Sequence, residues 1–180
     1  MSDTDESLVR RCIAGDRYAF ETLIEKYQKP VFNVAFRMAD DYEDARDISH
    51  TVFLKAFENL GTFAAGHRFY SWLYRIAINE SLNLLQKRRK TEAFDDRLES
   101  GGRTPEDQAQ GDEISRLVQR ALMSLGTDHR AVLILRHFLD CSYAEIAGVL
   151  DLPEKTVKSR LFTARQTLKA VLQKRGVLRS

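Results

Sequence analysis

The sequence predicts an all-α protein in which two small helical domains are joined by a flexible acidic linker. Apolar residues recur every three or four positions through most of the chain, and the alternating pattern typical of strands is scarce. Only 9 glycines and 3 prolines interrupt 180 residues. Residues 95–113 lack periodicity, and they contain two adjacent glycines, a proline and a concentration of acids. We therefore expect domains over residues 1–94 and 114–180, with the linker between them.

In the first domain, apolar residues step at helical spacing through residues 20–38. Pro30 interrupts this run, so it is either two helices or one kinked helix. A further helix is expected over residues 42–60, followed by a loop of small residues over 61–68. The last helix of the domain begins at residue 69 and continues into the basic run 87–90.

In the second domain, periodicity resumes over residues 114–125. The segment 126–128 (Gly-Thr-Asp) predicts a stop and a side-chain N-cap for a helix that ends near residue 138. Ser142 and Glu145 have the spacing of a capping box, in which the serine caps a helix and the glutamate bonds back to the serine backbone. A short helix follows.

The turn at residues 151–153 separates this short helix from a longer one, with Pro153 expected at the first helical position. A buried stripe is expected at Val157, Leu161, Ala164 and Leu168, opposite a basic and hydrogen-bonding face. This arrangement predicts a helix-turn-helix whose second helix enters a major groove. An αα-hairpin with a solvated basic face is the alternative.

Charge is unevenly distributed along the chain. Residues 1–60 carry 8 basic and 12 acidic side chains, whereas residues 61–94 carry 6 and 2. Residues 95–113 carry 2 and 7, and residues 114–180 carry 12 and 5. Two basic segments on either side of an acidic one indicate two surfaces for a polyanion. Charge alone favours the alternative of solvated helix faces and a polar linker.

Seven of the 17 aromatic residues lie within residues 53–74, interleaved with cations. Rings that stack on bases and cations that meet phosphates are typical of proteins that bind an unpaired strand. We expect Phe63 and Tyr70 to be the more exposed rings. We expect four others to lie in the core, at least in part: Phe53, Phe57, Phe69 and Trp72.

The motifs of catalysis and of metal binding are missing from the sequence. It has no P-loop, no dinucleotide-binding fingerprint and no set of residues typical of a nucleophile, so we predict a protein that is not an enzyme and binds no cofactor. His137 and Cys141 are spaced i, i+4, but two ligands are a weak metal signal, and we expect no metal site. With no signal peptide and no membrane-spanning run, a cytoplasmic protein is expected.

Three segments resemble the bacterial sigma factors of the extracytoplasmic-function (ECF) group. Residues 44–56 (DARDISHTVFLKA) are similar to the helix that binds core RNA polymerase, and residues 69–79 (FYSWLYRIAIN) to the helix that melts and reads the promoter −10 element. Residues 143–147 (YAEIA) and 156–165 (TVKSRLFTAR) resemble the region that reads the −35 element. Order, spacing and length agree with this group, which keeps only sigma domains two and four.

The resemblance implies three sets of site residues. Polymerase binding is implied for Asp44, Asp47, Ile48, His50, Thr51, Phe53, Leu54 and Lys55. Contacts to the −10 element are implied for Phe63, His67, Arg68, Tyr70, Trp72, Arg75 and Asn79. Contacts to the −35 element are implied for Lys155, Thr156, Lys158, Ser159, Arg160, Phe162, Thr163 and Arg165.

The implied partners are promoter DNA, core RNA polymerase and an anti-sigma factor. On the polymerase, the resemblance implies contacts with the clamp helices of the largest catalytic subunit and with the flap of the second-largest. Two other readings of the chain are a stand-alone helix-turn-helix regulator and a module that sequesters a partner without touching DNA. A sigma factor is expected to need core polymerase for promoter binding, whereas a stand-alone regulator binds duplex DNA alone.

Overall fold

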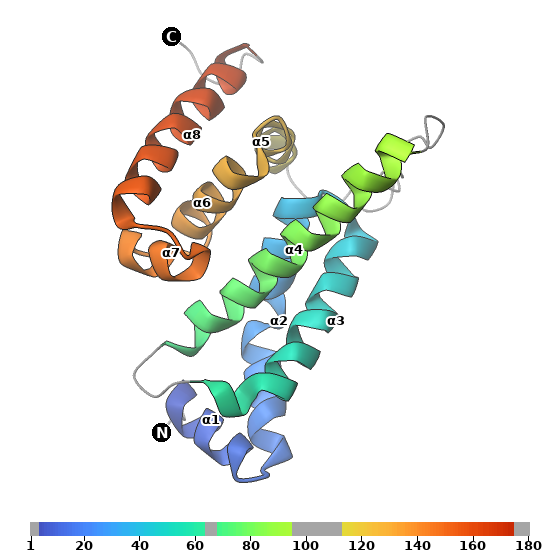
Figure 1. Ribbon diagram of the computed structural model, residues 1–180, viewed down its shortest axis with the longest axis vertical. Helices are drawn as coiled ribbons and strands as arrows, with labels where there is room; N and C mark the ends of the chain where they lie inside the picture. The colour runs from blue at the N-terminus through green and yellow to red at the C-terminus, as the bar shows by residue number, and fades with distance from the viewer. Residues whose placement is uncertain (1–3, 64–67, 95–112, 175–180) are drawn as a thin grey trace.

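The computed structural model describes residues 4–63, 68–94 and 113–174, and the regular elements in these ranges are all helical, which confirms the predicted class (Figure 1). In chain order they are α1 (Asp5–Ile13), α2 (Arg17–Ala39), α3 (Tyr42–Asn59), the short 3-10 helix η1 (Leu60–Thr62), α4 (Phe69–Phe94), α5 (Glu113–Met123), α6 (Thr127–His137), α7 (Tyr143–Leu150) and α8 (Glu154–Lys174).

The first lobe is built on α2, α3 and α4, which pack along one another, while α1 packs against α2 (Figure 1). Apolar side chains at helical spacing fill the space between them. In α3, for example, Ala45, Ile48, Val52 and Ala56 are each no more than 3% exposed. This stripe leaves the other side of α3 free to carry polar residues.

Helix α2 runs through Pro30 as a single element. A proline within a helix removes one backbone hydrogen bond and costs roughly 3 kcal/mol. Burial of Tyr27, Val31 and Val34 on either side of the proline offsets that loss. Of the two readings of this run, the single helix is therefore correct.

Two aspartates divide α2 from α3. Asp40 ends α2 in the left-handed conformation, with φ of 59°, which a short polar side chain tolerates. Asp41 then caps α3, because its carboxylate accepts a hydrogen bond from the Asp44 backbone N–H at 2.9 Å. The chain thus reverses direction between two long helices without an intervening loop.

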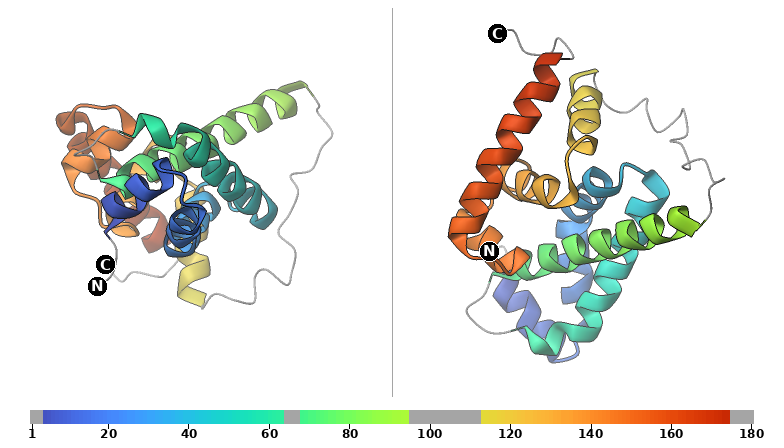
Figure 2. Two further views of the ribbon diagram at one scale, coloured as in Figure 1. Left: turned by 90° about the horizontal axis from the view of Figure 1, so that it is seen from below. Right: turned by 45° about the horizontal axis from the view of Figure 1, so that its top comes forward.

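The second lobe surrounds α6. Residues 131–135 are five consecutive residues that are at most 1% exposed, so this helix is covered on every side. Helices α7 and α8 cover it within the lobe, and α2 of the first lobe packs against it as well. Further contacts join α4 to α7 and α2 to α5. The two lobes therefore meet over an extended contact, with α8 on the outer side (Figure 2).

Two features differ from the sequence expectations. Helix α1 was not predicted, because its nine residues present only a short apolar run, of which Leu8 and Val9 are buried. The start of α6 has Gly126 at the N-cap position and no side-chain cap. The Asp128 carboxylate lies instead 3.3 Å from the Arg160 guanidinium.

Within the described ranges, none of the helices has the length and apolar character needed to cross a membrane.

Candidate nucleic-acid and polymerase interfaces

Helix α8 separates its side chains into a buried stripe and an exposed face. Val157, Leu161 and Ala164 are at most 1% exposed, and Leu168 is partly buried. Phe162 is 66% exposed, which is unusual for a large apolar side chain. The predicted −35 residues Lys155, Lys158, Ser159, Thr163 and Arg165 are also exposed, whereas Thr156 and Arg160 are half-buried at the border.

The turn before α8 is fixed by local hydrogen bonds. The capping box is present: Glu145 N–H donates to Ser142 Oγ at 3.2 Å, and Ser142 N–H donates to Glu145 Oε2 at 2.7 Å. Asp151 ends α7 with φ of 54°. Pro153 lies one position earlier than expected, since α8 begins at Glu154 and the Pro153 carbonyl accepts its first backbone hydrogen bonds.

The two arginines of α8 contact side chains of α6. Arg160 pairs with Asp128, and Arg165 Nε donates to His137 Nε2 at 3.3 Å. Partial burial, the charge of Arg165 and that of Arg136 lower the pKa of His137. Both guanidinium groups therefore lie at the edge of the exposed face, where groups that contact phosphates are expected.

His137 and Cys141 do not share the face of one helix, as their spacing had suggested. Helix α6 ends at His137, and Cys141 lies beyond it, 1% exposed, where burial raises the pKa of its thiol to about 12. Among the described residues, no group of three potential metal ligands comes together.

Phe63, Phe69 and Trp72 form an aromatic wall at the start of α4. Their ring centroids lie 5.7–5.9 Å apart in edge-on and tilted arrangements. Phe69 is buried, as expected, while Trp72 is only half-buried. Phe63 is less exposed than predicted, because it packs against the other two rings.

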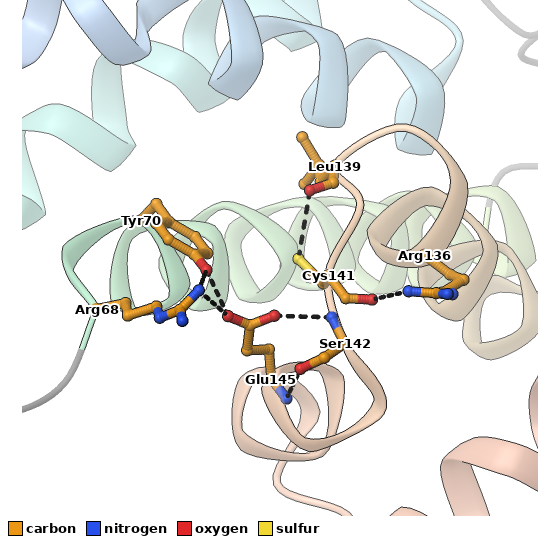
Figure 3. Close-up of polar contacts among 7 residues, drawn as sticks. All are labelled: Arg68, Tyr70, Arg136, Leu139, Cys141, Ser142 and Glu145. Atoms are coloured by element: carbon orange, nitrogen blue, oxygen red, sulfur yellow. Dashed lines mark hydrogen bonds and ion pairs between the residues drawn. The ribbon is translucent and has the colours of Figure 1, made fainter.

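Arg68 and Tyr70 meet Glu145 of the second lobe. Arg68 Nη1 lies 2.9 Å from Glu145 Oε1 and donates to Tyr70 Oη at 2.6 Å, and the Tyr70 hydroxyl donates a short hydrogen bond to the same carboxylate oxygen (Figure 3). We call Arg68, Tyr70, Ser142 and Glu145 the Glu145 cluster. The hydrogen bond from Tyr70 is the largest cause that lowers the pKa of the Glu145 carboxyl.

The other predicted −10 residues lie along α4. Arg75 is exposed and approaches the Asp151 carboxylate at 4.0 Å, and Asn79 is exposed one turn further along. His67 lies outside the described residues. A cavity of about 650 Å³ connects this surface to the second lobe. It is lined by residues of both lobes, including Phe63, Trp72, Arg75, Ser142, Gly148 and Val149.

The predicted polymerase face lies on α3. Asp47 and His50 are exposed, Leu54 is 53% exposed, and the Thr51 hydroxyl donates to the Asp47 carbonyl at 2.9 Å. Ile48 is 3% exposed within the core, so it supports the helix and cannot itself touch a partner. Its inclusion in the predicted face is wrong for that reason.

Two further residues of this face form ion pairs with α4. Asp44 lies 2.5 Å from Arg88, and Lys55 lies 2.6 Å from Glu80. Burial raises the pKa of the Asp44 carboxyl, and the Arg88 charge opposes that shift. Asp44 is therefore largely withdrawn from the surface that the sequence predicts for it.

An apolar groove of about 440 Å³ runs beside the polymerase face, between α2 and α3. Phe53 and Leu54 line it, together with Phe20, Ile24 and Phe57. Phe57 is 57% exposed, so the expectation that it belongs to the core is wrong. Its ring has Phe20 as an edge-on neighbour at 5.1 Å, which leaves the other side of the ring open.

Sequence reasoning missed Arg130, which joins the lobes at the end away from the Glu145 cluster. Arg130 is 5% exposed, and its guanidinium donates to the carbonyls of Leu122, Met123 and Leu125 and to the Met38 carbonyl at the end of α2. We call this set the Arg130 cluster. No local pattern marks it, because Met38 lies 92 residues away along the chain.

Two family models match the chain, "Sigma-70 region 2" over residues 23–91 and "Sigma-70, region 4" over residues 115–168. The chain belongs to the ECF group of sigma-70 factors. The RNA polymerase sigma-H factor of Pseudomonas aeruginosa is 36% identical over 183 residues, which cover 95% of each chain. The ECF RNA polymerase sigma-E factor of Escherichia coli is 37% identical over 92% of each chain.

Solved structures have the same fold. The structure of CnrH in complex with the cytosolic domain of CnrY matches with a TM-score of 0.76 and 26% identity, over 96% of this chain and 99% of that one. As a sigma factor, the protein directs promoter-specific transcription initiation and is not an enzyme. The match to region 2 lies outside the helix-turn-helix, so the reading as a stand-alone regulator is wrong.

Proposed function

We propose that this sigma factor uses three separate surfaces in initiation. The outer face of α8 reads the −35 element, the start of α4 binds the unpaired strand of the −10 element, and α3 binds the clamp helices of the largest polymerase subunit. The flap of the second-largest subunit is the proposed contact of the second lobe. Because its template and polymerase are cytoplasmic, we propose that the protein acts there.

The −35 assignment is supported by the separation of buried and exposed side chains on opposite faces of α8. Its buried stripe packs on the lobe, while Lys155, Lys158, Ser159 and Phe162 stand together on the exposed face. Lysine and serine bond base edges in a major groove, and an exposed phenylalanine suits the methyl group of thymine. The short α7 and the turn at Asp151 hold α8 at the surface.

The −10 assignment is supported by the chemistry around the aromatic wall. The half-buried Trp72 offers a ring for stacking, Arg68 and Arg75 supply positive charge, and Asn79 is free to bond a base edge. These groups lie between the residue before α4 and its third turn, so a single extended strand along the helix could contact them all.

We also propose an anti-sigma factor as a partner. The apolar groove beside α3 leaves Leu54 and Phe57 more than half exposed, which is typical of a surface that a partner covers. An apolar helix laid in this groove would prevent polymerase binding. Expression from the native operon followed by affinity isolation is expected to recover this partner.

The decisive test is run-off transcription with purified core polymerase. Promoter-specific transcripts are expected only when this protein is added to core enzyme. Asp47→Ala is expected to weaken core binding while leaving the circular dichroism spectrum unchanged. An Asp47→Ala protein with unchanged affinity for core enzyme would remove this face of α3 from the interface.

Base reading and phosphate contact on α8 are separable by substitution. Lys158→Ala is expected to cost ~1–3 kcal/mol at the preferred sequence and to relax discrimination at one base pair. Arg165→Ala is expected to weaken binding on every sequence and to lower the salt slope by about one phosphate contact. Equal loss on all sequences for Lys158→Ala would make Lys158 a phosphate contact.

A further inference from the structure

The Glu145 cluster brings an anion of the second lobe to the strand-binding surface of the first. Glu145 Oε1 accepts hydrogen bonds from Arg68 and Tyr70, while Oε2 accepts the Ser142 backbone N–H (Figure 3). Both carboxylate oxygens thus accept hydrogen bonds, and the side chain is only 19% exposed. Two donors, Tyr70 in the first turn of α4 and Arg68 just before it, converge on one oxygen that belongs to the other lobe.

A guanidinium beside a phenol hydroxyl is a set of donors suited to a phosphate. Phosphodiester oxygens accept charge-assisted hydrogen bonds of the same kind as a carboxylate does. Arginine and tyrosine are both common phosphate contacts in protein–DNA complexes. The place that the Glu145 carboxylate occupies is therefore also one where a strand phosphate fits.

Helix α7 also covers the rings of Phe63 and Trp72 beside the Glu145 carboxylate. The cavity between the lobes has Phe63 and Trp72 on one side and Ala144, Gly148 and Val149 of α7 on the other. A base that stacked on Trp72 would enter this cavity from the side that α7 closes. The carboxylate and the helix that bears it thus obstruct both the phosphate position and the stacking surface.

We propose that Glu145 takes the place of a backbone phosphate of the unpaired DNA strand, so that strand binding and closure of the two lobes exclude each other. This inference rests on the proposed −10 function of α4. A phosphate and the carboxylate cannot both bind Arg68 and Tyr70, because two anions held by the same donors would lie close enough to repel each other. Strand binding therefore separates α7 from α4, and any factor that opens the lobes strengthens strand binding equally.

The contact between Arg68 and Glu145 is suited to reversible opening. The Arg68 side chain is 71% exposed, so its ion pair is screened by solvent and contributes little to overall stability. The face of α8 remains exposed while the contact is closed, so duplex binding at the −35 element does not depend on opening. The closed contact is thus expected to weaken the binding of single strands and to leave the affinity for duplexes unchanged.

Glu145→Gln is a specific test, because glutamine also serves in a capping box, while the charge is removed and one of the two acceptor oxygens becomes an NH2 donor. The probe is a fluorescein-labelled single-stranded DNA of mixed sequence, titrated with the full chain by fluorescence anisotropy. We expect Glu145→Gln to bind this strand about tenfold more tightly than wild type, because a larger fraction of the protein is open. Emission of Trp72, the single tryptophan, is expected to shift to the red.

Asp140→Asn is the matched control. It removes one negative charge from the same lobe, its side chain is 100% exposed, and asparagine tolerates its φ of 51°. We expect its strand affinity to stay within about twofold of wild type. Equal gains for Asp140→Asn and Glu145→Gln would reduce the effect to net charge, and an unchanged Glu145→Gln affinity would equally overturn the proposal.

Run-off transcription separates this inference from the proposed function. If wild type supports promoter-specific transcripts and Asn79→Ala, at an exposed residue outside the Glu145 cluster, weakens strand binding, while Glu145→Gln behaves as wild type, then only the competition by Glu145 fails. If Asn79→Ala leaves strand binding unchanged, the −10 surface itself is wrongly assigned, and the competition fails with it.

Discussion

The two ends of the contact between the lobes hold the same kind of side chain in opposite surroundings. Arg130 is 5% exposed and donates to four backbone carbonyls, one at the end of α2 and three at the end of α5 and just after it. The Arg68 side chain is 71% exposed and pairs with the Glu145 carboxylate. If a buried guanidinium moved away, its carbonyls would be left without hydrogen-bond donors, whereas an exposed guanidinium can exchange one anion for another.

This difference assigns different roles to the two clusters. The Arg130 cluster fixes where α6 meets the end of α2, and burial lowers the pKa of the Arg130 guanidinium, a sign that solvent contributes little there. The Glu145 cluster lies beside the cavity at the start of α4. Opening is therefore expected to begin at the Glu145 cluster while the Arg130 cluster stays closed.

The largest effect is expected from breaking the buried end. Arg130→Met should lower the free energy of unfolding by roughly 3 kcal/mol, because buried carbonyls lose their donor and each unpaired group costs about 1–3 kcal/mol. Urea unfolding followed by circular dichroism measures this. Arg120→Met, at an exposed arginine of α5, is the control and should change stability by less than about 0.5 kcal/mol. Similar losses of unfolding free energy for both variants would show that the hydrogen bonds of Arg130 do not stabilise the contact between the lobes.

A smaller effect is expected from a contact between α2 and the end of α6. The Arg37 guanidinium lies 3.7 Å from the ring centroid of Phe138, and burial lowers its pKa. A double-mutant cycle with Arg37→Ala and Phe138→Ala should give a coupling free energy of about 1–2 kcal/mol, as for a partly desolvated cation–π pair. Strict additivity of the two substitutions would show that the pair does not hold the lobes together.

The smallest effect is expected from pH at the exposed end. The pKa of Glu145 is lower in the folded protein than the ordinary glutamate value of 4.5, so the ionised carboxylate stabilises the closed contact fully at neutral pH. This stabilisation is lost as the pH falls from 4.5 through the lowered pKa of the folded protein. Because Arg68 is exposed, the change should be under about 1 kcal/mol. Trp72 emission should redden in wild type on acidification and change less in Glu145→Gln. Parallel titrations of the two proteins would contradict the assignment.

Sequence periodicity predicted the features that depend on neighbours along the chain. The buried stripe of α8 at Val157, Leu161 and Ala164 and the capping box at Ser142 and Glu145 are both confirmed. Each rests on residues within one or two helical turns, where spacing alone decides which side chains meet. The resemblance of three segments then predicted the family, which the comparisons confirm.

The contacts between the lobes could not be predicted in this way. Glu145 was identified as a helix cap, yet its partners Arg68 and Tyr70 lie 77 and 75 residues away. The resemblance implies that Ile48 and Asp44 belong to the polymerase face, but Ile48 is buried in the core, and the ion pair with Arg88 holds the Asp44 carboxylate largely away from the surface. Phe57 was assigned to the core because most phenylalanines are buried, and only the packing of α2 against α3 shows it exposed.

The double duty of Glu145 has a genetic consequence. Glutamate caps α7 and meets Arg68, glutamine can do only the first, and aspartate is shorter by one methylene. Every glutamate codon becomes a glutamine codon by one base change, so a protein with a closed contact and a protein with an open one are immediate neighbours by mutation. A lineage could then gain or lose this form of control in a single step, with the fold intact on both sides of it.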